Sequence, residues 1–543
     1  MKVSKKWLNQ YVDIADISAQ TLADRLTLAG LEVESINYLA FGSNLVVGCV
    51  EACDKHPNAD HLSVTQVNVG SHTLQIVCGA PNIAKGQKVI VALSGAVLPM
   101  ITIEKAMIKG IESNGMICSL LELGVEPKYL SEDQKNGIEV LPDFAKVGED
   151  PLSVLGLDDV IIDIKQTPNR SDCNALWSVA YEVGALFKRE VKLPVSVAHD
   201  ELKPSIKIES KTEACPLILG KKIGQLSVTQ SPLWLKQALN AVGIKSINNV
   251  VDISNYVMIE TGQPLHFYDG HKLSKPEIIV MDHCKGYVTT LDESKIELNL
   301  EDIVITSNQI NIGLAGIMGG DDSKIDESTK SIIIEAALFN PARIRHTSRR
   351  VNLITEASLR FQKGLNPLGA KQAIMRATQL LIELANAFEV EETVTYGKTD
   401  ETLKQVSVTH NHIETLLGTS VDLDSIMDIF KRLGFEPQVK DKQIISTIPS
   451  YRLDITVSED LIEEVGRFIG YTDLVGTLPV MASTLGGYDD RQILRQRIKA
   501  NLVGAGLHEI VSYTLVSQEK TEIGFEPLAN PLRLISPISD ERA

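Results

Sequence analysis

Apolar and polar positions change their spacing along the chain. The first segment, residues 1–38, carries apolar residues at helical spacing after a polar start, which predicts a helix. These positions are Leu22, Leu26, Leu28 and Leu31. From Leu45 to about Val140, short runs rich in β-branched residues alternate with turns. That spacing is typical of a small all-β barrel of the OB type.

Helical spacing returns at 152–200, where apolar residues at 176, 179, 183 and 187 predict one buried helix face. Residues 201–400 mix both spacings and are punctuated by glycine, so we expect mixed α/β structure there. Residues 401–476 read as strand, helix and strand. Residues 477–543 begin a further helix and a strand.

At 543 residues, the chain is long enough for about three to five domains. The content of 44% apolar and 23% charged residues is that of globular proteins. We therefore predict a multi-domain α/β (α+β) protein. The predicted domains are an N-terminal α/β segment (1–38 with 152–200), an inserted OB-fold barrel (39–150), a mixed α/β domain (201–400), a small α/β domain (401–476) and the start of a last domain (477–543).

Composition also narrows the function. No stretch of about 18 apolar residues and no signal-peptide core occurs, which predicts a soluble cytoplasmic protein with no membrane partner. Seven scattered cysteines complete no zinc site and are expected to be reduced thiols. The net charge of −17 argues against DNA binding and against RNA binding by bulk electrostatics. Any RNA contact must be local.

Four carboxylates gather near the start of a predicted helix: Asp454, Asp460, Glu463 and Glu464. The last three are spaced i, i+3 and i+4, which predicts one shared helix face opposite the buried face. Oxygen ligands of this kind suit Mg²⁺. We expect no basic side chains beside them to clamp a phosphate, so a structural or interface metal is favoured over a catalytic pair. A solvated acidic helix face is the alternative.

Glu335 lies in SIIIEAALF (331–339), an otherwise apolar predicted strand. A buried carboxylate needs a partner, because burying an unpaired charge is costly. The partner is either an arginine or a ligand. The candidate arginines are Arg343, Arg345, Arg349, Arg350 and Arg360. The nearby run GLAGIMGGDD (313–322) allows close backbone approach, and His266 is either a packed core residue or part of a site.

Several motifs carry a family resemblance. HPNADHL (56–62), CGAPN (78–82) and GMICS (115–119) look like the tRNA-binding OB module of tRNA-associated proteins. With NRSDC, GQPLH, GIMGG, TEASLRF and RLDI followed by DLIEEVGRFIGY, in that order, the chain resembles the β subunit of bacterial phenylalanyl-tRNA synthetases. The β chain of that family continues beyond the start of a catalytic-like class II core, so we expect a C-terminally truncated chain.

The resemblance implies an α2β2 heterotetramer with an α subunit, binding of phenylalanine tRNA, and use of Mg²⁺ and of ATP by the holoenzyme. The α subunit would attach phenylalanine, and the β subunit would hydrolyse mischarged Tyr-tRNA. The implied catalytic residues are His266, Asn255 and Thr355. The implied substrate-binding residues are Glu335, Ala315, Gly316, Ala357, Ser254, Pro264 and Lys245. The implied metal ligands are Asp454, Asp460, Glu463 and Glu464.

The resemblance gives Glu335 a chemical role. Tyrosine differs from phenylalanine by one hydroxyl, and a site that hydrogen-bonds the hydroxyl can discriminate by roughly 10⁴ or more. Lys245 stands where many relatives carry Arg, so the bidentate fork for an RNA end is lost. Two rival functions stay open: a non-enzymatic tRNA-binding scaffold, and a stand-alone Mg²⁺-dependent hydrolase centred on 454–464.

Overall fold

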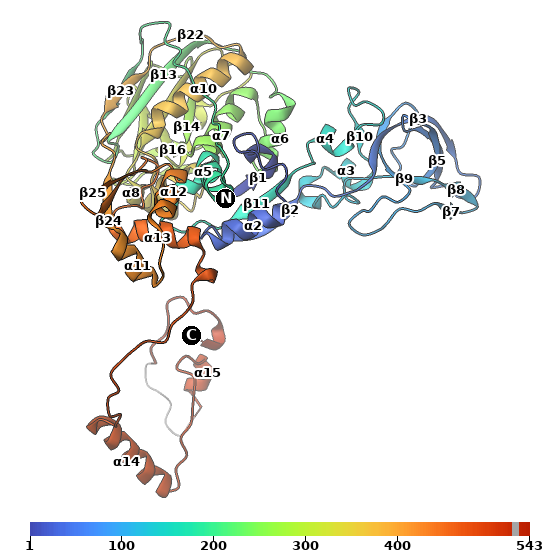
Figure 1. The fold of residues 1–543 in the computed structure, drawn as a ribbon. Coiled ribbons are helices and arrows are strands. Elements are labelled where there is room, and N and C mark those ends of the chain that lie inside the picture. The colour runs from blue at the N-terminus through green and yellow to red at the C-terminus, as the bar shows by residue number, and fades with distance from the viewer. Residues whose placement is uncertain (524–530, 543) are drawn as a thin grey trace. The chain divides into compact units, whose positions relative to one another are not determined.

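The computed structural model describes residues 1–523 and 531–542. The chain divides into two compact units, Met1–Val475 and Gly476–Ala543. Residues 524–530 and 543 of the predicted last domain lie outside the described part. Helices and strands alternate through the first unit, so the predicted mixed α/β class is confirmed (Figure 1).

The N-terminal segment folds around a three-stranded antiparallel sheet, β1 (Lys2–Ser4), β11 (Val160–Ile164) and β2 (Val33–Tyr38), in that order. Its helices are α1 (Lys5–Leu8), α2 (Ala19–Leu28) and α5 (Leu176–Phe187). Ser18 caps α2 by accepting a hydrogen bond from the Thr21 backbone N–H. Of the four predicted apolar positions, Leu22, Leu26 and Leu31 are buried, whereas Leu28 at the end of α2 is exposed. Because β11 follows the barrel in sequence, the barrel is inserted between β2 and β11.

The inserted part is a nearly closed barrel (Figure 1). Its sheet contains β10 (Val140–Leu141), β6 (Lys88–Leu93), β3 (Leu45–Lys55), β4 (Ser63–Asn68), β5 (Thr73–Cys78) and β9 (Gly115–Ile117). The Asn114 N–H donates to the Gln75 carbonyl at 2.9 Å and draws β5 toward β9. The smaller elements are the hairpin β7 (Ala106–Ile108) with β8 (Ile111–Ser113), and helices α3 (Glu132–Asn136) and α4 (Pro151–Leu155).

Two sheets face each other in the middle of the chain. The first contains β14 (Leu265–Asp269), β21 (Ile332–Leu338), β13 (Leu217–Gln225), β22 (Phe388–Val390) and β23 (Val394–Gly397). The second contains β12 (Lys207–Ser210), β15 (Glu277–Met281), β18 (Val304–Ser307), β19 (Ile310–Leu314) and β20 (Met318–Gly319). A hairpin of β16 (Tyr287–Thr289) and β17 (Lys295–Glu297) accompanies the second. Apolar residues of both sheets form one buried cluster between them, here called the inter-sheet core.

Side chains alternate along β21 and so serve two different cores. Ile333 and Ala337 face the inter-sheet core, whereas Ile332, Ile334 and Ala336 face the helices. The helices of this region are α6 (Leu233–Ala241), α7 (Asn249–Thr261), α8 (Pro341–Arg350), α9 (Glu356–Lys363) and α10 (Gly369–Ala385). Glu335 has the same parity as Ile333, so β21 directs it into the inter-sheet core.

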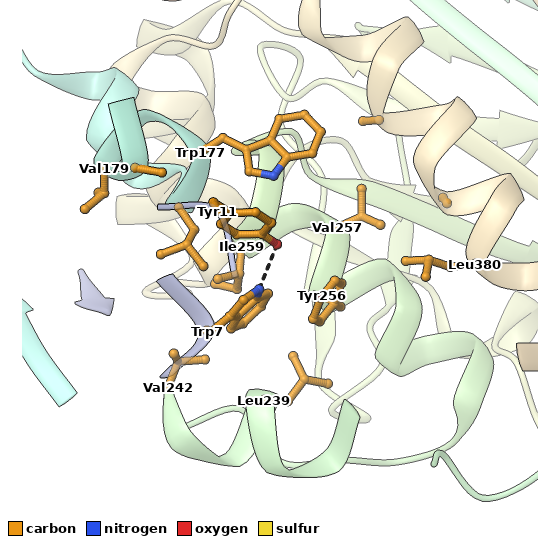
Figure 2. Close-up of a cluster of buried hydrophobic side chains, with 14 of the residues drawn as sticks. Trp7, Tyr11, Trp177, Val179, Leu239, Val242, Tyr256, Val257, Ile259 and Leu380 are labelled. Atoms are coloured by element: carbon orange, nitrogen blue, oxygen red, sulfur yellow. Dashed lines mark hydrogen bonds between the residues drawn. The ribbon is translucent and has the colours of Figure 1, made fainter. Parts of the chain in front are cut away.

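The helix-side core joins the N-terminal segment, including α5, to α7 (Figure 2). Trp7 stacks on Tyr256 with ring centroids 4.4 Å apart, and its Nε1–H donates to the Tyr11 hydroxyl at 2.9 Å. The Tyr11 hydroxyl in turn donates to Glu260 at 2.6 Å. Residues from 1–38, 152–200 and 201–400 therefore share one core.

The segment after 401 contains an antiparallel sheet of β24 (Gln405–Thr409), β26 (Gln443–Thr447) and β25 (Glu436–Lys440), with helices α11 (His410–Leu417), α12 (Leu423–Arg432) and α13 (Ser458–Ile469). The second unit contains α14 (Asp490–Gly504) and α15 (Gln518–Thr521). Short 3₁₀ turns lie at Pro127–Tyr129, Ser171–Asn174, Asp321–Ser323, Tyr471–Asp473 and Asp540–Arg542. The strand predicted after α14 is absent from the described part of this unit. None of the described helices combines the length and apolarity needed to cross a membrane.

Candidate functional site

Glu335 is buried and hydrogen-bonded to a tyrosine. In the β14–β21 pairing, His266 lies opposite Glu335, and the Tyr268 hydroxyl donates to Glu335 Oε2 at 2.5 Å. Glu335 is only 7% exposed. Its partner is thus a phenol on the neighbouring strand, a residue that the sequence analysis did not single out.

Of the two partners expected for Glu335, an arginine or a ligand, the arginine is not found. Three of the candidate arginines are committed to other acids: Arg343 to Asp282, Arg350 to Asp302, and Arg360 to Glu356. Arg345 and Arg349 form no ion pair within the described chain. A buried carboxylate without a cation is the arrangement that the sequence analysis associated with a ligand.

Burial sets the protonation of this group. It raises the pKa of Glu335 to about 7, although the Tyr268 hydrogen bond acts in the opposite direction. Burial also lowers the pKa of His266 to about 4, and His266 Nε2 has no hydrogen-bond partner within the described chain. At neutral pH the imidazole is therefore uncharged, and Glu335 titrates near neutrality.

The glycine-rich run brings the second sheet against these residues. A Cβ built on Gly319 would lie 2.2 Å from His266 Cε1, so the imidazole occupies the space of a side chain at this position. Gly316 has φ +65°, and its Cβ would lie 2.9 Å from Phe361 Cδ2. Both positions require glycine, one for close approach and the other also for backbone conformation.

Helix α9 closes the same region. Thr355 caps α9, accepting from the Ser358 N–H at 3.1 Å and donating to the Ile317 carbonyl at 2.9 Å. Ala315 is buried in the inter-sheet core, and Ala357 packs against its edge. The residues that the structure gathers around one core are Glu335, His266, Ala315, Gly316, Thr355 and Ala357.

Ser254 and Asn255 stay apart from Glu335. Ser254 and Asn255 lie on α7, which packs on the opposite face of β21. Ser254 donates to the Val251 carbonyl inside α7, and the Asn255 side chain makes no hydrogen bond within the described chain. Pro264 is buried just before β14, and Lys245 is exposed. Two residues were missed, Tyr268 and Gly319. The period-two spacing of 266 and 268 could have identified Tyr268.

The predicted carboxylate cluster does not form. Residues 1–523 and 531–542 contain no three His, Cys, Asp or Glu side chains arranged to hold a metal ion. Glu463 is exposed, whereas Glu464 is buried, so the expectation of a shared face is wrong. Asp460 accepts hydrogen bonds from the Thr456 and Val457 N–H groups at the start of α13.

Arginines neutralise the two remaining acids. Arg452 donates to both oxygens of Asp454 and, at 2.8 Å, to Glu464 Oε1. Arg467 also donates to Glu464, so basic side chains do lie beside these acids, and they are occupied in pairing with them. Since Asp454 and Glu464 are already paired with arginine, the four acids as they lie do not fit a common Mg²⁺ ion.

The sequence matches four family models. They are described as "Putative tRNA binding domain" (residues 45–150), "B3/4 domain" (214–386), "tRNA synthetase B5 domain" (406–471) and "Phenylalanyl tRNA synthetase beta chain CLM domain" (474–543). The two facing sheets and the residues around Glu335 lie within or beside the B3/4 match. The acids at 454–464 lie within the B5 match.

Whole-chain relatives agree with these matches. The phenylalanine–tRNA ligase β subunit of Staphylococcus aureus (strain MSSA476) is 41% identical over all of this chain and 69% of its own length. That of Bacillus subtilis (strain 168) is 40% identical over all of this chain and 68% of its length. A solved N-terminal fragment of the Pyrococcus horikoshii phenylalanyl-tRNA synthetase β subunit is 12% identical, covers 58% of this chain and 88% of that one, and has a TM-score of 0.33, too low to support an argument. The chain belongs to the phenylalanine–tRNA ligase β-subunit family.

Proposed function

We propose that this chain hydrolyses the ester bond that joins a wrongly attached tyrosine to a tRNA. The proposed pocket lies between its two facing sheets. The observation that carries the proposal is Glu335, a buried carboxylate whose partner is a phenol rather than a cation. A carboxylate held in this way suits recognition of a second phenol, the one that distinguishes tyrosine from phenylalanine.

In the proposed recognition step, Glu335 Oε1 accepts the hydroxyl of the tyrosyl group while Oε2 keeps Tyr268. Tyr268 acts as a positioning residue, because its bond fixes the carboxylate that reads the substrate. Phenylalanine offers no hydroxyl and would leave this acceptor unsatisfied, which costs binding free energy. Ala315, Gly316 and Ala357 are all small, and the proposal places the ring beside them.

In the hydrolytic step, the oxygen of a water forms a bond with the ester carbonyl carbon and the bond to the ribose oxygen breaks. The proton lost by the water is balanced by the proton gained by the ribose oxygen. We assign the positioning of this water to His266, whose neutral imidazole has an unpartnered Nε2, and to Thr355. Asn255 and Ser254 would take part only after a movement of α7.

The proposal includes an assembly. Family membership supports an α2β2 heterotetramer in which an α subunit uses ATP to attach phenylalanine to its tRNA, with the tRNA also contacting the barrel at 45–150. A cytoplasmic location remains a prediction from sequence, whereas Mg²⁺ at 454–464 is not part of the proposal, because the acids as they lie do not fit the ion. Only Asp460 and Glu463 of the four acids are free of arginine.

The decisive experiment compares Tyr-tRNA and Phe-tRNA as substrates of the assembled α and β chains. We expect the wild type to release tyrosine much faster than phenylalanine, and the Glu335→Ala variant to lose most of this difference while charging phenylalanine normally. Tyrosine release that persists in the variant would place recognition elsewhere. Intact tRNA binding without any release would favour the scaffold, and release abolished by a chelator would favour the metal-dependent hydrolase.

A further inference from the structure

Helix α8 presents three faces with different partners. One face is held by hydrogen bonds: Arg343 donates to Asp282, Thr347 to Asp302 and Arg350 to Asp302. A second face is buried, with Ile344 in the inter-sheet core and Ser348 bonded to the Leu353 carbonyl. Helical spacing places Arg345, His346 and Arg349 together on the third face. We call these three residues the α8 basic face.

The α8 basic face is exposed and has no acidic partner. All three side chains are solvent-exposed, and none of them forms an ion pair or hydrogen bond within the described chain. Two adjacent guanidinium groups left unpaired contrast with a chain whose net charge is −17. Acids are abundant, yet they pair with the neighbouring Arg343 and Arg350 and not with Arg345 or Arg349.

Helix α8 packs against the proposed pocket through its buried face and carries the α8 basic face on its solvent side. Ile344, on the buried face of α8, has its Cδ1 atom 3.2 Å from the position of a Cβ on Gly316. The chain turns directly from α8 into Thr355 at the start of α9. Helix α8 is therefore a neighbour of the residues proposed to hold the aminoacylated end, and its basic face is open to solvent.

We propose that the α8 basic face binds backbone phosphates of the tRNA acceptor stem while the aminoacylated end occupies the pocket; the pocket itself rests on the function proposed above. Arginine matches phosphate because its planar guanidinium donates two parallel hydrogen bonds. The barrel is a poor alternative source of phosphate contacts, because residues 45–150 contain no Arg and more acids than bases. Basic residues near a helix C-terminus also stabilise the helix dipole, but that effect would not require both Arg345 and Arg349.

The test uses the assembled α and β chains with uncharged tRNA and with an acceptor-stem minihelix. We expect Arg345→Gln with Arg349→Gln to weaken both complexes roughly three- to tenfold, the range for two exposed charge contacts. The slope of log affinity against log salt should fall in magnitude by about 1 for each phosphate that the variant no longer neutralises. The matched control, Arg25→Gln with Lys431→Gln, removes two exposed charges elsewhere and should change neither quantity.

A second readout separates this proposal from the pocket. In Tyr-tRNA deacylation, the Arg345/Arg349 variant should raise KM and leave kcat unchanged, since it touches no reacting atom. Wild-type affinity and salt slope in this variant would overturn the proposal, as would an equal loss in the control. Loss of the α subunit from the variant would instead identify the α8 basic face as a protein interface. Absence of deacylation in the wild type would reject the pocket, while the binding measurements would still decide the phosphate contact.

Discussion

Arg467 of α13 donates two hydrogen bonds to Glu182 of α5, a residue 285 positions earlier in the chain. The donor–acceptor distances are 2.7 Å to Oε2 and 3.0 Å to Oε1. Both side chains are buried, and Arg170 also donates to Glu182. This buried ion pair therefore links the segment after 401 to the N-terminal core. Glu464, which the sequence predicted to be a metal ligand, belongs to the same network.

Replacing Arg467 by Met should strongly destabilise the protein. The substitution leaves Glu182 and Glu464 buried with fewer cations, and breaking a buried ion pair on one side costs about 3–5 kcal/mol. Urea unfolding of the chain should report this loss in its free energy of unfolding. Lys165→Met, which removes an exposed pair with Glu32, is the control and should have little effect. Equal stability of the two variants would contradict the role of the network.

The same network predicts acid sensitivity. The arginines overcome the effect of burial and lower the pKa of Glu182 to about 2, and they also lower that of Glu464, both from an ordinary 4.5. Because the unfolded chain binds these protons first, the stabilisation is present above pH 4.5 and is lost as the pH falls from there toward 2. Unfolding curves between pH 6 and 3 should show this decline, and it should be smaller in Glu182→Gln.

The sequence predicted the helices and strands better than it predicted which side chains contact one another. Helix α2 follows from apolar spacing because it buries one face, whereas α5 and β21 are buried on nearly every side and follow from their high apolar content. The spacing around 460–464 misled, since it identifies a helix face but not which side chains pair with the acids: Arg467 from the same helix and Arg452 from the segment before it both bind Glu464. The same limit applies to Glu335. Its burial follows from the strand, but strand pairing in space decided that Tyr268 and not an arginine meets it.

Metal removal should leave the fold intact. Asp454 and Glu464 are neutralised by arginine, so no ion is needed to relieve their repulsion. Treatment with a chelator should therefore not change the free energy of unfolding of the isolated chain, and Asp460→Ala with Glu463→Ala should not change its metal content. A large fall in stability on chelation, reversed by Mg²⁺, would show that the acids rearrange around an ion.

Tyrosine release should depend on pH through Glu335. The ionised carboxylate of Glu335 accepts a hydrogen bond from the tyrosyl hydroxyl on either oxygen, whereas the protonated form carries a proton on one of them. Because burial raises the pKa of Glu335 to about 7, discrimination of tyrosine from phenylalanine should increase between pH 6 and 8. Glu335→Gln should remove this dependence. The pKa of Glu335 is also higher in the folded state than in the unfolded state, where it is 4.5, so the folded state binds this proton more tightly. Its contribution to stability is therefore greatest below pH 4.5 and falls by at most about 3 kcal/mol as the pH rises to 7.

Tyr268→Phe tests the role of Glu335 by removing the hydroxyl that donates a hydrogen bond to it. Removal of the hydroxyl leaves Glu335 with no hydrogen bond in a buried position, which should raise its pKa further and shift the pH profile of tyrosine release upward. A structural role alone would lower stability without moving the profile. The measurement is the rate of Tyr-tRNA deacylation from pH 6 to 9, with phenylalanine charging as the control activity.

Gly319→Ala should separate hydrolysis from ligation by the addition of one methyl group. The new Cβ would lie 2.2 Å from His266 Cε1 and 2.4 Å from Nε2, so the imidazole must leave its position opposite Glu335. Gly319 has no positive φ, so displacement of the ring rather than backbone strain causes the effect. Tyr-tRNA deacylation should fall at least tenfold, about 1.4 kcal/mol in the barrier, while phenylalanine charging by the α subunit persists.

The matched control for this change is Gly487→Ala, where a Cβ would meet nothing within 4 Å. It adds the same methyl group in the second unit and should leave both activities unchanged. Crystallography or NMR of the Gly319 variant should find the His266 ring rotated or shifted. If the ring moves and tyrosine is still released at the wild-type rate, His266 does not position the attacking water. Hydrolysis would then take place outside the inter-sheet core.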